Sequence, residues 1–270
     1  MRAIVIAFIF LVFSSVLSFS KDNENFINYS KSANVLPKGD FRYSLFGQTE
    51  VGLSNKLTIS AHPIMLFVSP SIDLKYNFMK NEKYSISTIH GATCPTLLLN
   101  LVKTKGTGGF ISPEFEIPFM LSIRNGIIGT YKYAPNHILS GSFVFEFALF
   151  NSSLDPGTSI DIPLISPRSA VYYRNAGFDL ALSAEGKICN KFDYAGKAEL
   201  FLFPFSNERY NSEYDKTTNS LFSEFSGMIF WNINKSIKLG AGARLCYGYY
   251  PYGEQWHLLP LLDFVKYVGK

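Results

Sequence analysis

Hydrophobic and polar positions alternate strictly over a long stretch near the C-terminus. Between Ile237 and Tyr249 every second residue is apolar or aromatic, and the residues between them are charged, glycine or cysteine. A period of two places these sets on opposite faces of an extended strand. The stretch is therefore predicted to be a strand with one apolar and one polar face.

The same alternation recurs from residue 40 almost to the end of the chain. The predicted strands cover residues 40–52, 56–68, 71–80, 84–91, 109–122 (irregular), 126–133, 138–150, 169–184, 191–204, 219–231, 235–249 and 256–268. Many of them are longer than the five or six residues usual in soluble sheets. Their length instead suits a tilted strand that crosses a membrane, which needs about nine to eleven residues.

Two physical constraints turn this pattern into a fold. Lipid offers no hydrogen-bond partners, so a membrane sheet must close on itself. Its strands then alternate lipid-facing apolar residues with inward polar residues. The sequence predicts an all-β protein, a single antiparallel transmembrane β-barrel of about 12 strands, with 10–14 allowed.

The connections between the predicted strands alternate in length. Residues 186–190 and 232–234 are short turns, whereas 151–168 and 205–218 are long links and 250–255 is intermediate. Short turns at one end and longer loops at the other are typical of membrane barrels.

One segment of the N-terminal half does not fit a strand. Pro95 followed by an apolar run and ended by Lys105-Gly106 predicts one short helix around 95–104. A helix that plugs the lumen, caps one end or lies on the membrane, and a surface helix that covers the sheet, are open alternatives for the segment 90–109.

The N-terminus has the layout of an export signal. A positive Met1-Arg2 precedes an apolar core at 3–13 and small residues up to Ser20. The core is shorter than the roughly 20 residues of a spanning helix, which disfavours an uncleaved anchor. The predicted organisation is a cleaved signal peptide at 1–20, a flexible N-terminal arm at 21–38 and a β-barrel domain at 39–270.

Composition narrows the classes of partner. Only 17% of the residues are charged and the formal net charge is +4, with no dense basic cluster, so no nucleic acid partner is expected. The cysteines Cys94, Cys189 and Cys246 are too widely spaced for a metal site or a disulfide framework.

The polar faces of the predicted strands collect charges of both signs. The lumen-facing candidates are Arg42, Glu50, Asp73, Lys75, Glu146, Asp179, Asp193, Lys197, Glu199, Lys238 and Arg244. In a narrow barrel they would pair across the lumen, and in a wider one they would line a water-filled passage. Mixed sign argues against strong selectivity for cations or anions.

Aromatic residues gather near strand ends. Trp231, Tyr247, Tyr249 and Trp256 are candidates for the membrane interface, where a ring can be buried while its polar edge stays wet. The alternative is that they form the core of a soluble sandwich.

The sequence contains no convincing catalytic motif. The four histidines lack the spacing of a metal site, and no GxSxG elbow surrounds a serine, so no metal, cofactor or catalytic residue is assigned. Strand pairing can still join a serine and a histidine from distant positions. His257, and His90 beside Cys94, are the first histidines to consider for such a pair.

The segment 51–78 (VGLSNKLTISAHP followed, after IMLFVS, by PSIDLKYNF) resembles a hairpin form of uncharacterised bacterial outer-membrane β-barrel proteins. The resemblance implies an outer-membrane location, membrane lipid as surroundings and the barrel assembly machinery as partner. Many such barrels end on an aromatic residue, whereas here Tyr267 lies three residues before the end.

Together these features favour an exported outer-membrane barrel that is a narrow channel, or a barrel handling small molecules or lipids, with a mixed-charge lumen. The alternatives are an outer-membrane lipid-modifying enzyme and a soluble exported β-sandwich binding module. Cargo, an open or plugged pore and oligomeric state depend on lumen width and loop conformation, which the sequence leaves open.

Overall fold

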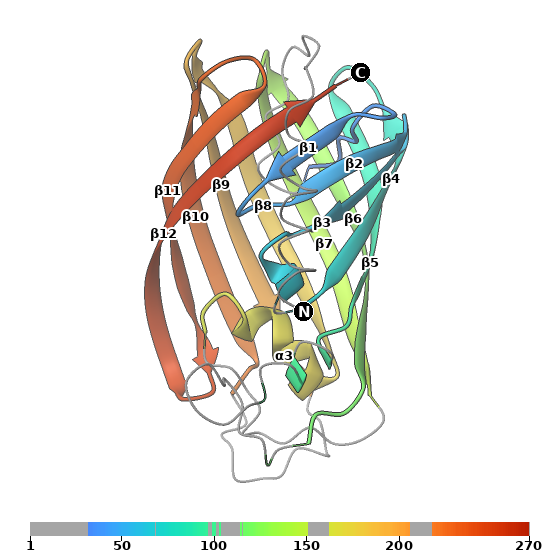
Figure 1. Cartoon of the computed structure of the whole chain (residues 1–270), viewed down its shortest axis with the longest axis vertical. Coiled ribbons are helices and arrows are strands. Elements are labelled where there is room, and N and C mark those ends of the chain that lie inside the picture. The colour runs from blue at the N-terminus through green and yellow to red at the C-terminus, as the bar shows by residue number, and fades with distance from the viewer. Residues whose placement is uncertain are drawn as a thin grey trace, which may run out of the picture.

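The computed structural model describes residues 32–67, 69–96, 99–100, 103, 114, 116–150, 162–205 and 218–269. Within these residues twelve strands form one closed sheet, in which every pairing is antiparallel. Figure 1 shows a tall barrel with α3 near one of its ends. The predicted single barrel of about 12 strands is confirmed, and the alternative of two packed sheets is wrong.

The strands follow one another around the barrel in chain order. They are β1 (Phe41–Ser44), β2 (Thr49–Ser54), β3 (Leu57–Ala61), β4 (Ser71–Lys80), β5 (Tyr84–Thr93), β6 (Met120–Ala134), β7 (His137–Phe150), β8 (Ala176–Cys189), β9 (Phe192–Leu202), β10 (Leu221–Asn232), β11 (Ile237–Tyr250) and β12 (Gly253–Val268).

The two faces of the wall differ in polarity. Large apolar side chains such as Ile127, Leu182 and Leu262 are exposed on the outside. Polar side chains such as Thr58 and Ser87 are buried on the inside. An apolar outer face and a polar inner face are the reverse of a soluble protein and suit a surface that contacts lipid. We therefore treat the barrel as spanning a membrane.

Two predicted strand boundaries at the N-terminal side are wrong. The predicted strand 40–52 is two strands, because residues 45–48 turn the chain back and Arg42 of β1 pairs with Glu50 of β2. The turn is stabilised by Ser44, whose Oγ accepts a hydrogen bond from the Gly47 amide at 2.7 Å. The predicted strand 56–68 ends at Ala61.

Two further boundaries are wrong nearer the middle of the chain. The predicted strand 126–133 and the last three residues of the predicted strand 109–122 belong to the one strand β6 (Met120–Ala134). Residues 116–119 are not in a strand, and residues 109–113 and 115 lie outside the described residues. The predicted strand 169–184 starts inside a helix, α3 (Ser166–Arg174), after which Asn175 has a positive φ of 65° and β8 begins. The number of strands is right because a split strand and a merged pair offset each other.

Short turns lie at one end of the barrel. Residues 55–56, 81–83, 135–136, 190–191 and 233–236 make the connections there. The opposite end carries the long connections 62–70, 94–119, 151–175 and 203–220, but also the short connections 45–48 and 251–252. The alternation in length therefore holds from β3 to β10 and fails at the first and last hairpins. The link 250–255 is shorter than predicted, because only Pro251 and Tyr252 separate β11 from β12.

The barrel closes through a short seam. Strand β1 pairs with β12 only from Val265 to Val268, and the Leu45 amide donates to the Phe264 carbonyl at 3.1 Å. From Gly253 to Leu262, the strand pairing of β12 within the described residues is with β11. The Asp263 carboxylate accepts hydrogen bonds from Ser44 Oγ and the Phe46 amide. Figure 1 shows β1, β2 and β3 as short strands beside the long β12.

Pro260 lies in this one-sided part of β12. Backbone groups of alternate residues point to the same edge of a strand. Because the Phe264 carbonyl points toward β1, the nitrogen of Pro260 faces the unpaired edge. Proline has no N–H and is tolerated at edges of this kind.

Helical segments occupy the loop end. In α3, Ala170 and Val171 are fully buried in a cluster that includes Phe203, Phe222 and Tyr250. In the predicted helix 95–104, Thr96, Leu99 and Asn100 are helical and the Leu99 amide donates to the Pro95 carbonyl at 3.0 Å. Most of its remaining residues lie outside the described part. No helix in the described ranges is long and apolar enough to cross a membrane.

Candidate functional site

The chain segment before β1 lies inside the barrel. Residues 32–38 belong to the polar arm predicted at 21–38, and Ser32, Ala33 and Leu36 are buried. The Ala33 carbonyl accepts hydrogen bonds from Asn77 Nδ2 at 3.1 Å and from Ser87 Oγ. The remainder of the arm and the predicted signal peptide lie outside the described residues.

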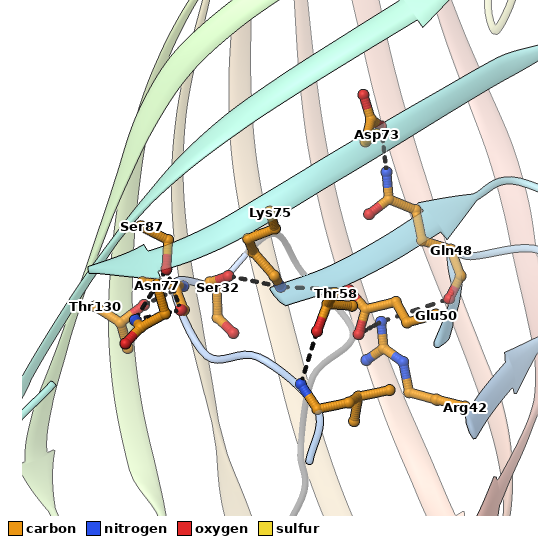
Figure 2. A network of polar contacts seen from close by, with 12 residues as sticks. Ser32, Arg42, Gln48, Glu50, Thr58, Asp73, Lys75, Asn77, Ser87 and Thr130 are labelled. Atoms are coloured by element: carbon orange, nitrogen blue, oxygen red, sulfur yellow. Dashed lines mark hydrogen bonds and ion pairs between the residues drawn. The ribbon is translucent and has the colours of Figure 1, made fainter. Parts of the chain in front are cut away.

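Two further hydrogen bonds hold this segment by its amides. Ala33 donates to Thr130 Oγ1 at 2.8 Å, and Leu36 donates to Thr58 Oγ1 at 2.9 Å. Since Thr58 is on β3 and Thr130 on β6, the segment reaches across several strands (Figure 2). We call residues 32–40 the interior segment.

Glu50 lies between two cations beside this segment. Its carboxylate contacts Arg42 Nη2 at 3.2 Å and Lys75 Nζ at 3.3 Å, and all three side chains are buried. Lys75 also donates to the Ser32 carbonyl at 3.0 Å (Figure 2). The cluster thus joins β1, β2 and β4 to the interior segment.

A second ion pair spans β4 and β6. Arg124 Nη2 contacts Asp73 Oδ1 at 2.8 Å, and Gln48 Nε2 donates to the other carboxylate oxygen at 3.2 Å. The strand between them, β5, carries Gly91 at this place. A Cβ on Gly91 would lie 2.1 Å from Asp73 Oδ1, so glycine leaves the space that the pair needs.

Helix α3 brings a third group of charges together. Arg168 binds Glu224 with two nitrogens, at 2.7 and 3.1 Å, and lies 3.9 Å from Glu199. Arg244 contacts the same Glu224 at 3.0 Å, and Lys197 contacts Glu199. A paired guanidinium and carboxylate hold a fixed geometry, so α3 is fastened to β10 and lies within ion-pair distance of β9.

Three more of the candidate charges make local contacts. Lys238 Nζ bonds Asp193 Oδ2 at 2.7 Å, close to the short-turn end. Glu146 accepts from Ser122 Oγ at 2.6 Å, and Tyr172 of α3 donates to the same serine oxygen at 3.2 Å. Ordered pairs of opposite sign therefore recur along the height of the barrel.

The eleven candidate charges are all buried or partly buried. Fully buried residues among them are Arg42, Glu50, Asp73, Lys75, Asp193 and Glu199, and the partly buried ones are Glu146, Asp179, Lys197, Lys238 and Arg244. Direct pairs within this set are Arg42–Glu50, Lys75–Glu50, Lys197–Glu199 and Lys238–Asp193. Asp73 and Arg244 bind partners outside the set.

Sequence reasoning missed several members of these clusters. Glu224 alternates with Phe225 in a predicted strand, so the period of two could have found it. Arg124 lies between the two segments into which the prediction divided β6, where the pattern is weak. Arg168 comes from the first turn of α3, at the end of the predicted loop 151–168, and no sequence signal marks it.

The candidate interface aromatics lie at two heights on the outside. Trp231, next to the short turn 233–236, and Trp256, next to the opposite turn, are 48% and 61% exposed. Tyr247 packs against Trp256 with ring centroids 4.5 Å apart, and Tyr249 follows at 6.3 Å from Tyr247. Trp231 pairs with Leu239, eight residues before Tyr247.

That spacing can be compared with a membrane. Eight residues span roughly 26 Å along a strand, or about 20 Å of height for a strand tilted by about 40°. The apolar band of membrane barrels is about 25 Å tall. The two aromatic levels are therefore separated by nearly the thickness of that band.

The two histidines singled out in the sequence contact an aromatic ring and a side-chain amide. His257 packs edge-on against Tyr250, with ring centroids 5.0 Å apart. His90 Nδ1 contacts Asn125 Oδ1 at 2.7 Å. No group of three metal-binding side chains occurs in the part of the chain that the structure describes, where all three cysteines are free.

Comparisons with known proteins find similarity to solved structures only at low sequence identity. No protein-family model and no curated protein sequence matches the chain. Among solved structures, outer-membrane expressed OmpT of Vibrio cholerae is similar at 7% identity and a TM-score of 0.43, over 82% of this chain and 63% of that one.

Two further solved structures are similar at the same level. The first is the KdgM porin in complex with disordered oligogalacturonate, at 8% identity and a TM-score of 0.42, over 86% of this chain and 98% of that one. The second is the P. putida toluene transporter TodX, at 10% identity and a TM-score of 0.39, over 86% of this chain and 78% of that one. This chain spans 63% of the length of the Vibrio protein.

Proposed function

We propose that the protein is an exported outer-membrane barrel that forms a narrow, internally obstructed passage for small solutes. The exposed apolar wall and the two aromatic levels support a membrane location. The apolar segment at 1–20 supports export, with membrane lipid and the barrel assembly machinery as partners. Fractionation of the native host checks the location, and N-terminal sequencing of the mature chain checks cleavage after Ser20.

One observation carries the proposal of a narrow passage. The interior segment lies inside the barrel along the neighbouring strands β3, β4, β5 and β6 and hydrogen-bonds to each of them. Paired charges lie at the same height, where the Glu50 carboxylate contacts Arg42 and Lys75. Paired charges present little net field, so the passage is expected to discriminate by size more than by charge.

Conductance and solute flux test this proposal. The full mature chain in a planar bilayer is expected to give small, weakly ion-selective currents. Liposomes containing it are expected to swell in small sugars and to exclude larger oligosaccharides. Large, steady currents typical of an open pore would contradict the proposal, as would a strong preference for one sign of ion.

A second candidate function rests on the one-sided stretch of β12. In lipid, an unpaired strand edge cannot stay without partners, and the residues facing outward beside it, including Leu258 and Leu262, are apolar. We propose as the alternative that an apolar or amphiphilic molecule passes between the interior and the membrane at this seam.

Matched variants separate the alternatives. Leu262 beside the seam and Leu182 on β8 are both 64% exposed. Under the second function, Leu262→Arg abolishes uptake of a fluorescent fatty acid into liposomes, whereas Leu182→Arg retains it. Equal uptake by both variants would exclude the seam as a route and leave the axial passage.

A further inference from the structure

Two polar side chains face outward in the middle of the apolar wall. His90 on β5 and Asn125 on β6 are opposite each other in the strand register and are both exposed. Their inward neighbours in sequence include Gly91, which is buried, so the alternation places the pair on the lipid side. Leu74 and Phe145 lie opposite them on the next strands.

The pair lies near the middle of the membrane-spanning height. Tyr84 and Tyr131, whose rings stack 4.9 Å apart, lie six residues away along β5 and β6. Six residues correspond to roughly 20 Å of strand, or about 15 Å of height at a tilt of about 40°. That is about half of a hydrocarbon core of about 30 Å.

The hydrogen bond between His90 and Asn125 determines which of their donors and acceptors remain available. His90 Nδ1 lies 2.7 Å from Asn125 Oδ1, an oxygen that can only accept, so Nδ1 carries the proton and donates. The neutral ring then offers Nε2 as an acceptor, and the Asn125 amide offers two N–H groups. Within the described residues, neither group has another hydrogen-bond partner.

Lipid cannot satisfy these groups. An amide or imidazole left without a partner in hydrocarbon is costly, and polar residues at membrane depth usually bind one another or a partner. Asparagine and histidine are among the side chains that hold membrane segments together. Any partner must therefore offer both an acceptor and a donor within an apolar surface.

We propose that a second copy of this chain is that partner. Rotation about a two-fold axis along the membrane normal places His90 of one copy opposite Asn125 of the other. Each amide then donates to the other copy's Nε2, and the two contacts are equivalent. Exposed Ile127 and Phe143 surround the pair and provide the matching apolar surface.

Replacement of the pair tests the interface. The full mature protein is reconstituted in liposomes at varied protein-to-lipid ratio, and self-association is measured by energy transfer between labelled copies. The variant His90→Leu with Asn125→Leu is expected to weaken association at least tenfold. Ser223→Val, which removes an outward-facing hydroxyl on β10, is the control and is expected to associate like the wild type. A heat-modifiability gel verifies that each variant folds.

Cross-linking locates the contact. In a Cys189→Ser background, which removes the exposed native thiol, Ile127→Cys is expected to form a disulfide-linked dimer. Ile229→Cys, on β10 and similarly exposed, is expected not to do so. Monomeric wild type at all ratios, association that survives loss of the pair, or preferential linkage through position 229 would each overturn the proposal.

Discussion

Glu50 shows how much a single interior side chain determines. Its carboxylate neutralises Arg42 and Lys75, and all three groups are buried. Glu50→Gln leaves two buried cations without their counter-charge, a change that typically costs about 3–5 kcal/mol. We expect a loss of that order in the free energy of unfolding, measured with guanidinium in detergent micelles.

The turn between β4 and β5 offers a matched control for this change. Glu82 is exposed there, so Glu82→Gln is expected to alter the free energy of unfolding by no more than about 0.5 kcal/mol. Equal stability of the two variants would mean that Glu50 is not needed to balance the cations.

His62, in the connection between β3 and β4, gives a prediction about pH. Burial, together with nearby Arg168, lowers the pKa of His62 to about 4. The unfolded chain binds a proton near pH 6.5 and the folded chain does not, so stability present above pH 6.5 is lost as the pH falls toward 4. Comparison with His62→Gln isolates this contribution.

Between pH 7 and pH 5 the wild type is expected to lose about 1–2 kcal/mol more than this variant. Guanidinium unfolding at both pH values provides the measurement. An identical pH dependence in the two proteins would show that His62 titrates normally.

At the scale of elements, the interior segment is fitted closely to the wall. A Cβ on Gly52 of β2 would lie 2.0 Å from the Pro37 carbonyl oxygen. Gly52→Ala is therefore expected to displace the interior segment and raise the single-channel conductance at least twofold. Gly129→Ala is the control, because a Cβ on Gly129 meets nothing within 4 Å. Unchanged conductance in Gly52→Ala would show that this segment does not restrict the passage.

Elements with regular alternation could be predicted from the sequence, and those shaped by tertiary contacts could not. Strands such as β11 have one side in lipid and one in the interior, so their period of two is strong. Helix α3 has little amphipathic pattern because it is surrounded by the barrel and has buried side chains on several sides, Tyr172 and Ala170 among them. The turn between β1 and β2 depends on hydrogen bonds of Ser44, which alternation does not reveal.

At the scale of the molecule, the sequence indicates which charges point inward but not which ones meet. Asp73 and Arg124 are 51 residues apart and pair across an intervening strand. Their pairing depends on the strand order and on the absence of a side chain at Gly91. The inward positions of charged residues could therefore be predicted from the alternation. Their ion-pair partners could be identified only from the closed sheet.

The whole barrel carries a prediction of its own. A closed sheet resists unheated detergent, so the folded protein is expected to migrate faster on a gel than the boiled protein. The comparison uses protein extracted from membranes, with the unheated and boiled samples run side by side. Identical migration of the two samples would contradict a closed membrane barrel.

The short seam has a consequence for the order of assembly. Strands β11 and β12 are joined by fourteen residue pairs, whereas β1 and β12 are joined by four. Strand β1 is also joined to β2 by only two residue pairs, so the weak link of the ring is β1 with its two short pairings. This link is expected to open first under thermal fluctuation and to form last during insertion. Residues 32–40 lead directly into β1. They must therefore already lie within the curved, unclosed sheet when β1 pairs with β12. Closure of the ring and enclosure of the chain's own leading segment are thus a single event.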